Sequence, residues 1–159
     1  MEGDSELQDL YRETLLDYFR SGAHKGKLDP ADLRSHGLNP VCGDEIEITM
    51  NSGKDGRVGQ LRFTGHGCVI SQASSAMMAE SLEGLPLSRA RELGAAFKAM
   101  MLSKTPLESL PPELETLKAL EGVRKYPMRV KCATLAWNTL QQGLMRDEKT
   151  GQAEFQEVE

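Results

Sequence analysis

The sequence of 159 residues lacks the features of several common classes of protein. It has no run of about 18 or more apolar residues, which a membrane-spanning helix requires. It has no excess of basic residues either, because 24 acidic residues outnumber 19 basic ones and give a net charge of −5. That balance argues against a nucleic-acid binder, which needs a basic face. The acidic, polar first six residues are unlike a signal peptide, and we expect a cytoplasmic protein.

Cysteine is scarce as well, with only Cys42, Cys68 and Cys132 in the chain. An odd number of widely spaced cysteines is a poor framework for disulfide bonds. Reduced thiols in a cytoplasmic protein are either buried and inert or used for metal and sulfur chemistry. The surroundings of each cysteine therefore decide what kind of protein this is.

The hydrophobic pattern predicts an α+β fold in which a small antiparallel β-sheet packs against several helices. One domain is expected over residues 1–146, followed by an acidic, flexible tail at 147–159. Residues 22–44, rich in glycine and proline, are expected to form a long irregular loop. Strands are predicted at 45–51 and 57–64, and helices at 5–20, 69–82, 88–102, near 112–120 and at 129–146.

Each cysteine is predicted to lie at the edge of an element and not within an apolar stripe. Cys42 lies in a turn that enters a strand, Cys68 begins a helix, and Cys132 is placed in the first turn of the last helix. The N-terminus of a helix lowers the pKa of a thiol because its unpaired N–H groups favour the thiolate. Thiolate is both the nucleophile and the metal ligand, so these positions favour chemistry over inert burial.

Three thiolates do not complete the tetrahedral coordination that zinc adopts in proteins. Two nearby side chains can supply a fourth ligand, namely Asp44, two residues from Cys42, and His66, two residues from Cys68. The spacing of the cysteines matches no local metal-binding signature, and inert burial stays an alternative. The residues by themselves thus predict a three-thiolate metal or sulfur site with an undecided fourth ligand.

Three segments of the sequence resemble the U-type iron–sulfur cluster assembly family. They are residues 39–44 (Asn-Pro-Val-Cys-Gly-Asp), 65–78 (beginning Gly-His-Gly-Cys-Val-Ile-Ser) and 129–137 (Arg-Val-Lys-Cys-Ala-Thr-Leu-Ala-Trp). The resemblance extends from Leu10 to about Gly143. Within the family, the chain is more similar to the SufU-type zinc-dependent sulfurtransferases than to the IscU-type scaffolds. Lys131 stands where the scaffolds have a histidine, and residues 105–123 look like the insertion of the sulfurtransferases.

The resemblance implies one zinc ion held by Cys42, Asp44, Cys68 and Cys132, with Cys42 also acting as the sulfur acceptor. The implied activity is a sulfurtransferase that takes persulfide sulfur from a SufS-type pyridoxal-phosphate cysteine desulfurase. The sulfur would then pass to downstream SUF cluster-assembly proteins. From its charge and position we further hypothesise that Arg129 holds the thiolate or persulfide. The alternatives are a scaffold that binds iron and sulfide without catalysing transfer, and a purely structural zinc domain.

Overall fold

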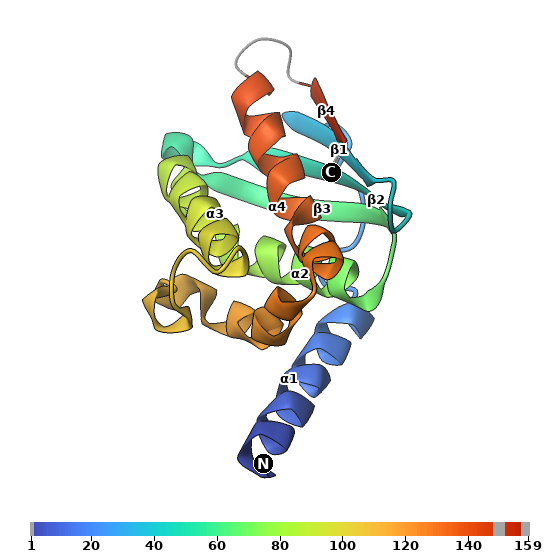
Figure 1. Cartoon of the computed structure of the whole chain (residues 1–159). Helices are drawn as coiled ribbons and strands as arrows, with labels where there is room; N and C mark the ends of the chain where they lie inside the picture. The colour runs from blue at the N-terminus through green and yellow to red at the C-terminus, as the bar shows by residue number, and fades with distance from the viewer. Residues whose placement is uncertain (1, 148–151, 157–159) are drawn as a thin grey trace.

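A four-stranded sheet in the order β3-β2-β1-β4 forms one layer of the protein (Figure 1). The structure, a computed structural model, describes residues 2–147 and 152–156. Its strands are β1 (Leu33–Asn39), β2 (Asp44–Ser52), β3 (Val58–His66) and β4 (Gln152–Gln156), and its α-helices are α1 (Glu2–Arg20), α2 (Val69–Leu82), α3 (Leu87–Met101) and α4 (Pro127–Asp147). Short 3₁₀ segments are η1 (Lys54–Gly56) and η2 (Leu107–Ser109), with a longer one at η3 (Pro112–Lys125). The predicted α+β fold is confirmed.

Strands β1, β2 and β3 are antiparallel neighbours, whereas β4 runs parallel to β1 at the edge of the sheet. A tight turn at residues 40–43 joins β1 to β2, and Asn39 pairs with Asp44 across it. The N–H of Gly43 donates to the Asn39 carbonyl at 2.8 Å, and Gly43 has φ of +75°, which favours glycine. This turn carries Cys42.

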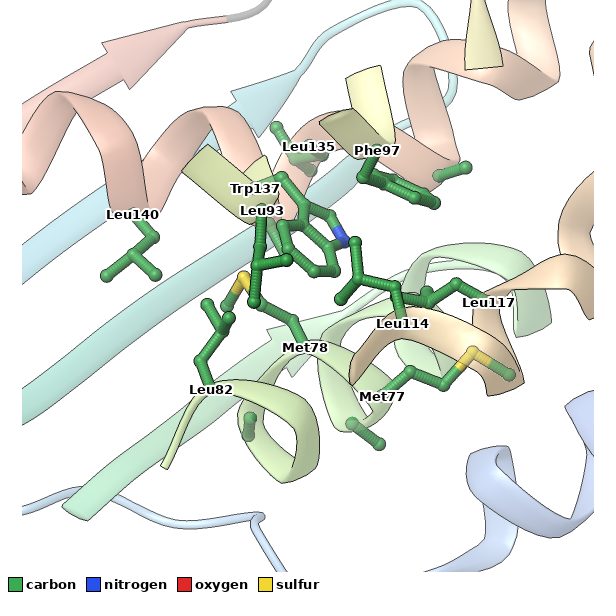
Figure 2. Packing of buried hydrophobic residues seen from close by; sticks show 14 of the residues in the cluster. Met77, Met78, Leu82, Leu93, Phe97, Leu114, Leu117, Leu135, Trp137 and Leu140 are labelled. Carbon is green, nitrogen blue, oxygen red and sulfur yellow. The ribbon is translucent and has the colours of Figure 1, made fainter. Parts of the chain in front are cut away.

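The helices cover one face of the sheet, with α2 and α4 across it and α1 extending away from the body (Figure 1). The core lies between this face and the helices, and Trp137 of α4 is at its centre (Figure 2). The Trp137 ring stacks on Phe97 with 4.6 Å between centroids, and its N–H donates to the Ser74 hydroxyl at 3.1 Å. This packing holds α2, α3 and α4 together. Among the residues that the structure describes, no helix is both long enough and apolar enough to cross a bilayer.

The prediction of an irregular loop over residues 22–44 is wrong for residues 33–39, which form strand β1. The inward-facing residues of β1 are Leu33, Ser35, Gly37 and Asn39, of which only the first is a large apolar residue. A Cβ at Gly37 would lie 1.9 Å from the Thr139 hydroxyl oxygen of α4, so the side chains of α4 leave no room for a larger residue at this position. Small and polar inward residues therefore hide the alternating pattern on which strand prediction depends.

Three other boundaries differ from the prediction. The segment after Pro112 stays helical to Lys125, and α4 begins at Pro127, which places Cys132 in its second turn rather than its first. Residues 152–156 of the predicted flexible tail form β4 against β1. The rest of that tail, residues 148–151 and 157–159, lies outside the described part of the chain. The division into a domain at 1–146 and a tail stays a prediction.

Candidate metal centre

Four elements meet where the turn at 40–43 approaches the helices. The turn brings Cys42, the first residue of β2 is Asp44, the N-cap of α2 is Cys68, and α4 contributes Cys132. One ligand atom each from Cys42, Asp44 and Cys132 lies within 4.8 Å of the other two. Cys68 is outside this group of three, but its thiol lies near the Cys132 thiol, which lowers the pKa of Cys68. The structure thus gathers residues that are up to 90 positions apart in the sequence.

Asp44 is the most informative member because its carboxylate is buried and only half satisfied. Its Oδ1 accepts a hydrogen bond from the Cys68 backbone N–H at 3.0 Å. Its Oδ2 is buried and has no hydrogen-bond partner among the residues that the structure describes. A buried carboxylate oxygen without a partner is costly unless a cation compensates it. Three thiols and this oxygen are a donor set that suits a tetrahedral zinc ion, so the residues fit the metal.

The two helix-borne thiols shift each other's pKa values in opposite directions. The hydrogen bond from Cys132 lowers the pKa of Cys68 to about 6 against the opposing effect of burial, and the Ser71 N–H at the start of α2 contributes to the lowering. The same hydrogen bond raises the pKa of Cys132, and burial raises it further. Cys68 is therefore the thiol that ionises first, as its helix N-cap position predicts.

Glycine at position 67 allows β3 and α2 to close around Asp44. A Cβ at Gly67 would lie 2.6 Å from Asp44 Oδ1, closer than a carbon and an oxygen can approach, and 3.1 Å from the Ser71 hydroxyl. Any larger residue would therefore displace the carboxylate or the helix N-terminus. The Gly-His-Gly-Cys segment is a structural requirement of the site as well as a sequence signature.

Three buried polar residues next to the site were not predicted. Asn39, Ser71 and Gln72 each keep side-chain polar atoms without a hydrogen-bond partner among the described residues. Asn39 faces Asp44 in the β1–β2 register, and the other two lie in the first turn of α2. Asn39 faces inward on β1, a strand that the sequence pattern did not reveal. Recognising that strand would have identified Asn39 as a residue near the site.

The remaining predicted site residues take different places. The Arg129 guanidinium lies beside Cys68 and Cys132, and negative charge at Cys68, and then at Cys132, raises the pKa of Arg129. Arg129 is itself exposed, so it covers the thiols from the solvent side. His66, the other candidate for the fourth ligand, has a side chain that is 73% exposed and pairs with Glu45 at 3.2 Å. It is not a member of the ligand group, whereas Asp44 is.

Known proteins are similar to this chain over most of its length. Residues 10–133 match the model of the NifU-like N terminal domain family. The chain is 36% identical to the zinc-dependent sulfurtransferase SufU of Bacillus subtilis, over 93% of this chain and 98% of that protein. It is also 36% identical to the iron–sulfur cluster assembly scaffold protein IscU of Streptococcus pyogenes, over 89% of this chain and 87% of that one.

Solved structures show the same fold. A putative iron–sulfur cluster assembly scaffold protein for the SUF system from Fervidobacterium islandicum superposes with a TM-score of 0.74 at 35% identity, covering 83% of this chain and 94% of that one. A nitrogen-fixing NifU-like protein from Brucella abortus has a TM-score of 0.79 at 22% identity, covering 89% and 96%, and supports the fold alone.

Proposed function

Because the chain belongs to the NifU-like N-terminal domain family of iron–sulfur cluster assembly proteins, we propose that it is a zinc-dependent sulfurtransferase of the SufU type. It would accept persulfide sulfur from a SufS-type cysteine desulfurase and pass it to downstream SUF cluster-assembly proteins. The observation that carries the proposal is that the residues gathered around Asp44 differ in their exposure and in how they are anchored. An exposed cysteine on a turn stands beside a buried carboxylate and two thiols held by helices.

Asp44, Cys68 and Cys132, with Cys42 as the fourth ligand, are the residues that would hold zinc. The bound ion would supply charge that keeps the thiols deprotonated near neutral pH. The chain itself contributes rigidity, because Asp44 is held by the Cys68 N–H and the two helix-borne cysteines are held by each other. Cys42 is the exposed member of the three cysteines, so it is the thiol that a second protein can reach.

The transfer step is a thiolate attack on sulfane sulfur. The Cys42 thiolate forms a bond to the terminal sulfur of the persulfide on the desulfurase, and the sulfur–sulfur bond of that persulfide breaks. The desulfurase cysteine leaves as a thiolate, while Cys42 carries the transferred sulfur as a persulfide. No net oxidation occurs. The guanidinium of Arg129, which contacts Cys68 and Cys132, would place positive charge beside the anionic sulfur.

A scaffold function is the second candidate, and one observation favours it. The IscU proteins of Streptococcus pyogenes and Thermotoga maritima, both 36% identical to this chain, are named as cluster assembly scaffolds. Their names describe those proteins and not this one. Lys131, in the position where the scaffold pattern has a histidine, removes a potential imidazole ligand from the side of Cys132 and supports transfer over cluster building.

The decisive experiment measures metal content and desulfurase stimulation together. The protein as purified is expected to contain about one zinc per chain, the number that one tetrahedral site holds, and to accelerate alanine release by a SufS-type desulfurase. Cys42→Ala is expected to keep part of its zinc and lose all stimulation, because three ligands remain while the acceptor thiol is gone. Val41→Ala is the matched control in the same turn and should stimulate normally.

Two results would contradict the proposal, and a third would change the ligand set. Unimpaired stimulation by Cys42→Ala would show that this thiol is not the acceptor. A protein that holds no zinc, and instead forms a stable coloured cluster after incubation with iron and sulfide, would support the scaffold. Zinc content equal to the wild type in an Asp44→Ala variant would remove Asp44 from the ligand set.

A further inference from the structure

Two neighbouring cavities open near the metal centre. The larger, about 1170 Å³, lies between α1, the start of α2, η3 and the start of α4, and reaches Cys68 and Arg129. The smaller, about 580 Å³, lies between the end of α3 and the outer side of α4. Ser103 and Arg124 line both cavities, so the two are adjacent on the surface. We call the pair of cavities the basic trough.

The charge of the basic trough is opposite to that of the protein. Its lining contains six cationic side chains, which are Arg12, Lys98, Arg124, Lys125, Arg129 and Lys131. Among the residues that the structure describes, Glu121 is the only carboxylate in the lining, and Arg124 pairs with it at 3.6 Å. The whole chain has 24 acidic and 19 basic residues. A mixed distribution would have given the trough at least as many carboxylates as cations, so positive charge is concentrated here.

Exposed apolar side chains are concentrated at the same place. Tyr126 is 60% exposed and lines the larger cavity, while Leu102 is 54% exposed and lines the smaller one. Met128, also 54% exposed, follows Tyr126 at the start of α4. Large apolar residues surrounded by polar ones at the surface commonly mark an interaction site for a protein. Aromatic and methionine side chains are enriched in such sites.

We propose that the basic trough is the docking surface for an acidic segment with apolar anchoring side chains, carried by the protein that delivers the sulfur. This inference rests on the proposed function, since the trough ends at Cys68 and Arg129. A segment seated in it would place its own protein against the metal centre. Cys42 would remain open, because it does not line the trough.

Charge decides both the kind of partner and the side from which it approaches. A protein of net charge −5 repels an acidic partner over most of its surface, so the trough is where association is favoured and oriented. A nucleic acid would also be attracted to six cations. The exposed Leu102, Tyr126 and Met128, together with the overall negative charge, favour a protein segment instead.

The test compares two double charge reversals on the full chain. Lys98→Glu with Lys125→Glu reverses one cation in each cavity without touching Arg129 or a proposed zinc ligand. Arg20→Glu with Arg91→Glu makes the same change of charge at two exposed positions outside the trough. Binding to a SufS-type desulfurase is measured by sedimentation or fluorescence anisotropy at several salt concentrations. Stimulation, zinc content and thermal unfolding are measured on the same samples.

The trough variant is expected to raise the Kd for the desulfurase by about 10-fold or more, as loss of complementary charge at an interface does. Its affinity should also depend less on salt, while its zinc content stays normal. The control variant should bind within about 2-fold of the wild type because its cations face no partner. Equal binding by the two variants would overturn the docking proposal, as would a wild type that does not bind.

Two further outcomes separate the possibilities. A wild type that binds the desulfurase without stimulating it would contradict the proposed function. The ratio of the Kd values of the trough variant and the control variant would still test the docking surface. A labelled single-stranded oligonucleotide serves as the competing probe. Retention of this probe by the wild type but not by the trough variant, near physiological salt, would assign the trough to nucleic acid and overturn the proposal.

Discussion

The two sides of the metal centre differ in how firmly they are built. Cys68 and Cys132 stand on helices that pack against the core, hydrogen-bond to each other, and lie close to the buried Asp44. Cys42 stands on a turn between two strands, is exposed to solvent, and has an exposed valine beside it. One side is a rigid frame, and the other is a surface loop.

This difference explains how a single site can hold a metal and still release one ligand. Groups fixed by packing keep their positions when a partner arrives, because moving them would disrupt the core. A turn residue with few contacts can move at little cost. If Cys42 carries sulfur, the frame of Asp44, Cys68 and Cys132 must hold the zinc while Cys42 is engaged elsewhere.

The largest effect is expected from breaking the frame at Gly67. Gly67→Ala adds a Cβ that would stand 2.6 Å from Asp44 Oδ1, so the carboxylate or the N-terminus of α2 must move and the hydrogen bond between Asp44 and the Cys68 N–H is disrupted. We expect zinc affinity to fall by about 10- to 100-fold, the loss that follows when groups supporting metal ligands are removed. Competition with a chromophoric chelator measures this affinity.

A matched control for this substitution is Gly22→Ala, which lies outside the basic trough. A Cβ at Gly22 meets no atom within 4 Å and requires no unusual backbone angle. Zinc affinity should be unchanged in this variant, and desulfurase stimulation should stay close to normal. Equal affinities in Gly67→Ala and the wild type would mean that the frame is not closed around Asp44.

A smaller effect, on the free energy of unfolding, is expected at the far end of the helix that carries Cys68. Glu83 caps the C-terminus of α2, and burial works to raise the pKa of its carboxyl group. Hydrogen bonds from the Leu61 N–H and the Arg62 guanidinium, at 2.8 and 2.6 Å, outweigh burial and lower that pKa below its ordinary value. A carboxyl group whose pKa is lower in the folded state stabilises the fold above its unfolded pKa, near 4.3 for glutamate. This stability is lost as the pH falls through the folded value.

Glu83→Gln should therefore lower the free energy of unfolding by about 1 kcal/mol at pH 7. The difference from the wild type should shrink below about pH 4, where the wild-type carboxyl group becomes protonated as well. Denaturant unfolding at pH 7 and at acid pH measures both values. If the variant loses the same free energy of unfolding at both pH values, the charge of Glu83 does not anchor α2.

The sequence predicts the frame better than the turn. Helix α2 has the predicted bounds because glycine and proline residues flank it on both sides. Strand β2 lies within one residue of its prediction because polar and apolar residues alternate along it. Strand β1 is missed because Ser35, Gly37 and Asn39 face inward against α4. The gathering of the cysteines depends on long-range packing, which local periodicity does not describe. The residues alone predicted a site of three thiolates and left Asp44 and His66 open as the fourth ligand, and the resemblance to a family selected Asp44.

The smallest effect on stability and metal binding is expected on the turn itself. Val41 is 45% exposed and adjoins Cys42, so Val41→Ala removes apolar surface that is already half in water. We expect the free energy of unfolding to change by less than about 0.5 kcal/mol, as at other exposed positions. Zinc affinity should also be unchanged, because the frame residues hold the ion without help from this side chain. A loss of zinc affinity as large as that of Gly67→Ala would place the turn within the rigid frame. Cys42 would then be a fixed ligand, and it could not leave the site to accept sulfur.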